Sequence, residues 1–235
     1  MLNRASLQAL RRWGHRRNLP GMCGLLLHRA LWYLVRRLLP PFRFRFQGKK
    51  YAYRIHPFIL NNERCVEIPL VMDFVRNRPG ADMLEIGNVL SAFQRINAVV
   101  VDKYEQAPGV LNEDVVDYRP EQGFDLIVSI STLEHIGWDE IPKAPEKVVR
   151  AVDHLKTLLK PGGEVIATVP VGYNSSLDQS LREETLGLDI RGYLQRVSGW
   201  NVWREVSPAV ALSAAFNAPY ACGNAIAVGY WRRPC

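Results

Sequence analysis

The residues Asp82-Met-Leu-Glu-Ile-Gly-Asn-Val-Leu-Ser91 decide the fold of this 235-residue chain. A short apolar segment carrying an acid, Glu85, runs into Gly87, and a helical pattern begins immediately after it. This order predicts a strand, a tight turn that needs glycine, and a helix whose free N–H groups face a ligand, as in nucleotide sites. Because many strands end in glycine, the prediction depends on the motifs at fixed distances further along the chain.

Further segments continue the alternation of strands and helices. Strands are expected at 98–101, 110–111, 124–131 and 164–169, and helices at 66–76 and from Pro145 to the breaker Leu159-Lys-Pro-Gly-Gly163. The segment that begins at Phe124 is almost continuously apolar, as a parallel strand buried on both faces should be. The alternation predicts a doubly wound α/β sheet with right-handed crossovers.

Charge divides the chain into two parts. The net charge is +7, yet residues 1–62 contain 13 Lys or Arg and no acid, so residues 63–235 are acidic on balance. We therefore expect a basic N-terminal arm, residues 1–62, and a main domain, residues 63–235. Such an asymmetry indicates an arm that meets a polyanionic surface.

Two helices and a hairpin are expected in the arm. Leucines recur at helical spacing between 22 and 39, but His28, Arg29, Arg36 and Arg37 interrupt the apolar run that a membrane span requires. A helix lying on an anionic membrane through residues 1–40 fits better, with a core-packing helix as the alternative. Nucleic acid is the least favoured partner, because no recognition motif for it is present. Period-two segments on both sides of Gln47-Gly-Lys-Lys50 predict a β-hairpin.

Four cysteines lie far apart, without a Cys-x-x-Cys pair. Neither a zinc site nor a disulfide framework is indicated, so reduced thiols in the cytoplasm are expected.

Polar residues come after the predicted strands, at the edge where open parallel sheets bind ligands. Asp102 lies just past the second strand, where an acid suits the hydroxyls of a ribose, and Asp114 lies past the third. A solvent-facing Asp at a strand end is the simpler interpretation of either residue alone.

Taken together, these motifs resemble those of class I S-adenosylmethionine-dependent methyltransferases. The residues that carry the resemblance lie between 83 and 174: Glu85-Ile-Gly87, Asp102, Asp114-Val115, Phe124-Asp125, Leu133-Glu-His135 and Leu159-Lys-Pro-Gly-Gly163. The chain also resembles small bacterial methyltransferase-like proteins of surface-polysaccharide loci, through Asn62-Glu-Arg, Val66-Glu-Ile-Pro and Gly87-Asn-Val-Leu-Ser.

This resemblance implies a seven-stranded sheet of order 3-2-1-4-5-7-6, with the last strand antiparallel. Residues 225–231 would form that strand and residues 194–206 the one before it. It also implies S-adenosylmethionine as the cofactor and assigns contacts with it. Glu85 and Gly87 would lie beside the methionine part, Asp102 at the ribose, Asp114 and Val115 at the adenine, and Ser129 near the sulfonium. Asn88 and Lys103 are further residues expected to bind the cofactor.

The sequence departs from the family in the loop, where Val89 and Ser91 replace two glycines. Glycines serve there because a side chain would hold the backbone away from the ligand. Val89 must therefore point away from the ligand, or the loop must take another path.

On the acceptor side, His135 is the candidate general base and Tyr173 a second catalytic candidate, next to Asn174. A structural role after the fourth strand, and a turn, are the simpler interpretations of His135 and Asn174. Ser131 stands where some metal-binding relatives have an acid, so no metal is expected. Three tryptophans, Trp138, Trp200 and Trp203, are candidates to stack on a sugar, although tryptophans usually serve packing.

The sequence thus favours a cytoplasmic methyltransferase, peripheral on the inner membrane face, that methylates an oxygen of a glycan or lipid-linked saccharide. A catalytically inactive module with the same fold is the alternative. A nicotinamide-dependent oxidoreductase fits poorly, because Gly87-x-Val89-x-x-Ala92 lacks two of the three fingerprint glycines.

Overall fold

The computed structural model describes residues 34, 42–56, 59 and 61–235. The two helices expected between residues 2 and 39, and the membrane contact assigned to residues 1–40, lie outside the described residues, apart from Leu34.

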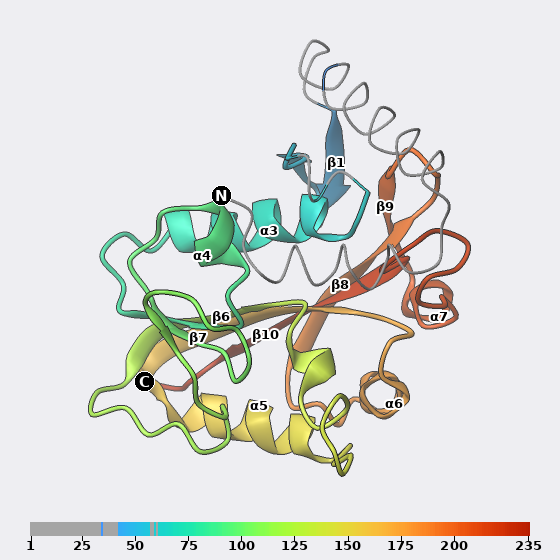
Figure 1. Cartoon of the computed structure of the whole chain (residues 1–235). Coiled ribbons are helices and arrows are strands. Elements are labelled where there is room, and N and C mark those ends of the chain that lie inside the picture. Colours follow the sequence, from blue (N-terminus) through green and yellow to red (C-terminus); the bar gives the residue numbers. More distant parts are fainter. Residues whose placement is uncertain (1–33, 35–41, 57–58, 60) are drawn as a thin grey trace.

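An eight-stranded sheet forms the centre of the described chain (Figure 1). Its strands, in spatial order, are β5 (Val110–Leu111), β4 (Val99–Val101), β3 (Met83–Ile86), β6 (Phe124–Ile130), β7 (Leu159–Pro170), β10 (Ala225–Arg232), β8 (Asp189–Arg196) and β9 (Trp203–Val206). The strands from β5 to β7 run parallel, and β10 is antiparallel to both of its neighbours. The first seven strands have the predicted order 3-2-1-4-5-7-6, which confirms the expected fold class.

One strand prediction was wrong. The segment expected as a single strand over 194–206 forms β8 and β9, which pair antiparallel to each other across residues 197–202. The backbone of Asn201 lies in the left-handed region, with φ of 55°, and its side chain accepts a hydrogen bond from the indole of Trp203 at 2.7 Å. The chain therefore turns back at this point, and β9 adds an eighth strand to the edge.

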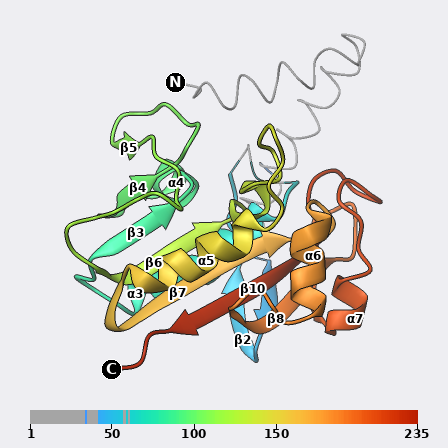
Figure 2. The same ribbon diagram turned by 90° about the horizontal axis from the view of Figure 1, so that it is seen from below.

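Helices cover both faces of the sheet. The helices α3 (Arg64–Arg76) and α4 (Leu90–Phe93) lie on one side, whereas α5 (Lys147–Thr157) and α6 (Ser175–Arg182) lie on the other (Figures 1 and 2). A 3-10 turn, η1 (Leu133–His135), comes after β6, and a short helix, α7 (Pro208–Ala211), comes after β9. The alternation of side chains along β6 sends Ile127 toward α5 and Leu126 toward α3, so the sheet separates two apolar clusters.

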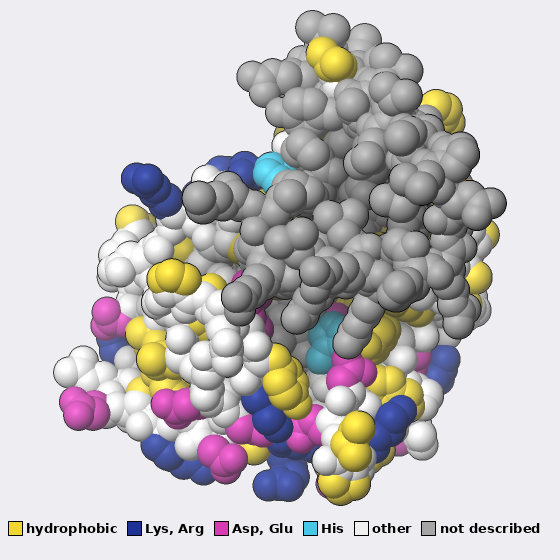
Figure 3. Space-filling view, viewed as in Figure 1, with side chains coloured by type: hydrophobic (Ala, Val, Ile, Leu, Met, Phe, Trp, Pro, Cys, Tyr) yellow, Lys and Arg dark blue, Asp and Glu magenta, His cyan; other side chains and the backbone are white. Residues whose placement is uncertain are grey.

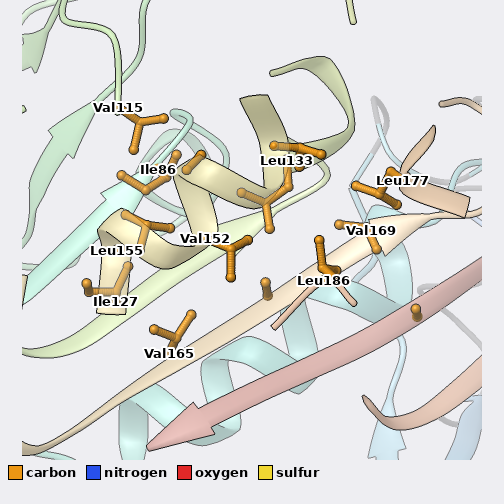
Figure 4. Close-up of a cluster of buried hydrophobic side chains, with 14 of the residues drawn as sticks. Ile86, Val115, Ile127, Leu133, Val152, Leu155, Val165, Val169, Leu177 and Leu186 are labelled. Atoms are coloured by element: carbon orange, nitrogen blue, oxygen red, sulfur yellow. The ribbon is translucent and has the colours of Figure 1, made fainter. Parts of the chain in front are cut away.

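The cluster on the α5 side holds the parallel strands against their crossover helix (Figure 4). Val152 and Leu155 of α5 pack in this cluster with Ile127 and Val165 of the sheet, and all four are buried. Full burial of such a side chain contributes about 1.5–3 kcal/mol to folding. This packing fixes the direction in which the carboxyl ends of β3, β6 and β7 point.

The predicted hairpin is present as β1 (Arg43–Phe46) and β2 (Lys49–Ala52). Phe44 and Phe46 are buried in the same apolar cluster as α3. The hairpin also reaches β9, because the backbone N–H of Trp203 donates to the Tyr53 hydroxyl at 2.8 Å and that of Gln47 donates to Glu205 at 3.0 Å.

Two observations concern the surface. None of the described helices is long and apolar enough to cross a membrane. Basic and acidic side chains are interspersed over the described part of the face that Figure 3 shows, rather than gathered into one patch.

Candidate active site

The loop after β3 is held by Glu85. This side chain is buried, and its carboxylate accepts hydrogen bonds from the backbone N–H groups of Val89 and Ser91, both at 2.9 Å, and from that of Leu90. Burial raises the pKa of Glu85, and these hydrogen bonds oppose the rise. The N–H groups expected to face a ligand therefore face Glu85. The expectation was wrong on this point, because a buried carboxylate takes the nearest donors.

The same loop contains a single glycine, Gly87, and carries Val89 where the family has a second one. Val89 is buried in the α3-side cluster, so it points away from the sheet edge. Gly87 has φ of +80°, and a Cβ placed on it would overlap the side chain of Thr132. Gly87 is thus required both by its backbone conformation and by the close approach of Thr132 from the next loop.

Asp102 and Asn88 lie on the loops after β4 and β3. One oxygen of Asp102 accepts from the backbone N–H groups of Tyr104 at 2.8 Å and Glu105 at 2.7 Å, which closes the loop after β4. The Asn88 amide donates to the Glu105 carboxylate at 3.2 Å, so the two loops are joined.

Asp114 is the centre of an ion-pair network. Its carboxylate lies 2.7 Å from the ammonium of Lys103 and 2.5 Å from that of Lys147, and both lysines also contact Glu140. Burial opposes the ionisation of Asp114, but the hydrogen bonds from the two lysines outweigh it and lower its pKa. Val115, expected against an adenine ring, is buried in the α5-side core with Ile86 (Figure 4).

His135 and Tyr173 meet at the carboxyl ends of β6 and β7. Asp139 joins them: its carboxylate lies 2.7 Å from Nδ1 of His135 and accepts from the Tyr173 hydroxyl at 2.8 Å. The two rings contact edge to face at 4.8 Å between centroids. His135 and Asp139 are each 43% exposed, so this group is accessible from outside. Asn174 has a different role, since it caps α6 and donates to the Glu134 carbonyl.

Near His135 lies a buried acid cluster, which we define as Glu63, Glu67 and Glu134. Glu67 of α3 is fully buried, and the Ser131 hydroxyl donates to its carboxyl group at 2.8 Å. Burial and the neighbouring Glu63 raise the pKa of Glu67 to about 8. Burial raises the pKa of Glu134 well above its ordinary value, and Oε2 of Glu134 has no hydrogen-bond partner among the described residues.

Several polar groups at this edge keep hydrogen-bonding capacity that suits S-adenosylmethionine. Ser129 pairs in register with Ile86 of the neighbouring strand, is completely buried, and its hydroxyl has no partner within the described part of the chain. Asp102 keeps its second oxygen, and the Asp114 carboxylate has acceptor sites beyond those that the lysines use. These groups fit a polar ligand that spans β5 to β6. Within the described residues, no group of three or more His, Cys, Asp or Glu side chains is arranged so that it could hold a metal ion.

Comparisons with known proteins give distant likenesses. No family model and no curated protein matches the sequence. Among solved structures, N-methyltransferase NodS from Bradyrhizobium japonicum with S-adenosyl-L-homocysteine is 13% identical, with a TM-score of 0.44 over 72% of this chain and 86% of NodS. A possible histamine N-methyltransferase from Thermotoga maritima is also 13% identical, with a TM-score of 0.43 over 71% of this chain and 87% of its own. At these distances they assign no activity.

Sequence reasoning missed Asp139, Glu67 and Glu134. Asp139 comes four residues after His135, a spacing that suggests contact only if the chain turns there. Glu67 belongs to the Val66-Glu-Ile-Pro segment, but no local pattern connects it with Glu134. Of the tryptophans, Trp203 is buried and packs in the core, whereas Trp200 is 58% exposed.

Proposed function

We propose that the protein is an S-adenosylmethionine-dependent methyltransferase that methylates an oxygen of a glycan or lipid-linked saccharide at the cytoplasmic membrane face. The observation that carries the proposal is the meeting of His135, Asp139 and Tyr173 at the carboxyl edge of a 3-2-1-4-5-7-6 sheet. Open α/β sheets bind ligands at this edge. The saccharide acceptor rests on the sequence resemblance and on the basic arm.

When bound, the cofactor supplies an electrophilic methyl group on a sulfonium. Asp102, Gly87, Asn88, Lys103 and Ser129 would hold it, with Asp114 and Val115 toward the adenine and Glu85 fixing the loop. The protein's own contribution is then to orient the acceptor and to remove a proton from its hydroxyl.

The His135 imidazole is suited to the second task. Asp139 accepts from Nδ1–H, so the neutral ring keeps the lone pair of Nε2 for the acceptor's proton. The Tyr173 hydroxyl donates to the same carboxylate and keeps it in place. Tyr173 also lies against Phe216 at 4.9 Å between ring centroids, which supports its orientation.

An inactive module with the same fold is the second candidate. It is favoured by the loop after β3, where Glu85 takes the N–H groups and Thr132 lies against Gly87. Binding of the cofactor product decides between the two candidates.

A thermal-shift titration with S-adenosyl-L-homocysteine tests the proposal. A ligand that binds only the native state adds about 2.7 kcal/mol at a hundredfold excess over its Kd, which raises the Tm of a chain of this size by about 5–10 °C. The Asp102→Ala variant is expected to lose most of this shift, whereas Asp153→Ala on the exposed side of α5 keeps it. No shift at millimolar ligand favours the inactive module.

The membrane location has its own test. Because the arm is basic, the full chain is expected to sediment with anionic vesicles and to be released by salt, which screens such contacts over about 8–10 Å. Binding that ignores lipid charge, or no binding at all, contradicts the peripheral location without affecting the enzyme assignment.

A further inference from the structure

The buried acid cluster brings three carboxyl groups together in the interior of the described chain. Glu63, Glu67 and Glu134 are each at most 6% exposed, and they come from the start of α3 and from η1. Of the described basic side chains, Arg64 acts on Glu67 and Glu134, the buried Arg196 acts on Glu63, and His135 lies beside Glu134. In this part of the protein an uncompensated charge is costly.

The three carboxyl groups differ in how they are satisfied. Glu63 accepts from the backbone N–H of Gly223 at 2.9 Å, and Glu67 accepts from Ser131. Glu134 is the exception: its Oε2 has no partner in the part of the chain that the structure describes, although the side chain is 2% exposed. Buried polar atoms without a partner are uncommon in native proteins, and they point to a missing group.

The Glu134 carboxyl group lies next to the proposed acceptor site. Its Oε1 is 3.5 Å from Nε2 of His135, a distance too long for a good hydrogen bond. The half-exposed imidazole therefore lies beside Glu134 without being bound to it. The ring of Tyr173 contacts the same imidazole edge to face, at 4.8 Å between centroids.

We propose that Glu134 and Glu67 bind the protonated amino group of the methyl acceptor, so that the acceptor is an amino-bearing saccharide. The identity of the bound molecule as the methyl acceptor rests on the proposed function. The ammonium group donates to Oε2 of Glu134 and supplies positive charge to the cluster. The methyl group still goes to a hydroxyl, whose proton His135 removes.

Proton release accompanies this binding. Burial raises the pKa of the Glu134 carboxyl group well above its ordinary value, and its charged or titratable neighbours are Glu67, Glu63, Arg64 and His135. An adjacent ammonium favours the ionised form, so the carboxyl group loses its proton to solvent while the ammonium keeps its three protons. No covalent bond forms or breaks in the acceptor during this step.

Isothermal titration calorimetry with D-glucosamine tests the inference, with D-glucose and N-acetyl-D-glucosamine as uncharged comparators. Titrations at pH 7 in phosphate and in Tris, whose ionisation enthalpies differ, give the number of protons released. We expect glucosamine to bind at least tenfold more tightly than glucose and to release protons on binding. Glu134→Gln is expected to lose both the preference and the release, while Glu183→Gln, an exposed control at the C-terminal end of α6, keeps both.

Equal affinity for the three sugars, no saturable binding of glucosamine, or full binding by Glu134→Gln overturns the inference. If circular dichroism shows that Glu134→Gln is unfolded, Glu67→Gln is titrated instead and is expected to lose the same preference. The titration uses no methyl donor. Glucosamine binding with proton release but without methyl transfer would refute the proposed function alone, whereas methyl transfer without a glucosamine preference would refute this inference alone.

Discussion

Replacement of Glu67 by glutamine should change how the stability of the protein depends on pH. In the folded protein the pKa of Glu67 is raised from 4.5 to about 8, chiefly because the side chain is completely buried. A raised folded pKa means that the folded state holds this proton more tightly than the unfolded state does. The contribution of Glu67 to the stability of the folded wild type is therefore greatest below pH 4.5, and it is lost as the pH rises toward 8.

Each pKa unit corresponds to about 1.4 kcal/mol, so the shift of Glu67 costs the folded state roughly 5 kcal/mol once the pH exceeds 8, and roughly 3 kcal/mol at pH 7. The glutamine side chain cannot ionise and still accepts from the Ser131 hydroxyl. The free energy of unfolding of Glu67→Gln, relative to wild type, should therefore rise by several kcal/mol between about pH 5 and pH 8.5.

Urea denaturation monitored by tryptophan fluorescence at about pH 5, 7 and 8.5 measures this difference, with m-values checked for equality. Glu183→Gln, exposed on the protein surface, controls for the loss of an acid that is not buried. If Glu67→Gln and wild type differ by the same amount at all three pH values, Glu67 is ionised normally and the reasoning about the buried acid cluster is wrong.

Three further substitutions probe the site. Gly87→Ala should lower the free energy of unfolding by about 1–3 kcal/mol or more in urea denaturation, because the residue has a positive φ and the new Cβ would overlap Thr132. Adding Thr132→Ala to this variant should restore part of the loss. Lys147→Met should cost roughly 3–5 kcal/mol by the same measurement, because it leaves two carboxylates short of a buried partner, and an unchanged midpoint would contradict this ion-pair network. Tyr173→Phe removes a hydrogen bond to Asp139 and should lower kcat for methyl transfer by roughly tenfold with little change in Tm, and equal kcat would remove Tyr173 from the proposed chemistry.

Much of the fold could be predicted because local patterns and strand order are linked. The period of the apolar residues identified the parallel strands, and Gly87 marked the first turn correctly. The split of 194–206 into two strands could not be predicted, because it depends on Asn201 adopting a left-handed backbone conformation and bonding Trp203. A contact of this kind, between a loop residue and a buried indole, produces no repeating pattern of apolar residues in the sequence.

The candidate site was predicted unevenly for a related reason. The position of His135 and Tyr173 at the carboxyl edge could be predicted because each comes soon after a parallel strand, and all such positions meet at one edge. Asp139 forms hydrogen bonds with both residues, but it lies in an irregular loop after η1. No repeating pattern in the sequence predicts the path of that loop. Glu67 reaches the same region from α3, far away in the sequence. Its hydrogen bond with Ser131 could therefore be recognised only in the tertiary structure.

The contact between the hairpin and β9 has a consequence for association. β9 is the last strand of the sheet, and such an edge offers unpaired backbone groups to other chains. Here the backbone N–H of Trp203 is taken by the Tyr53 hydroxyl, and Glu205 is tied to the hairpin turn at Gln47. The hairpin thus shields the rim of the sheet, and a shortened chain without it would present an open border on which its own copies could aggregate.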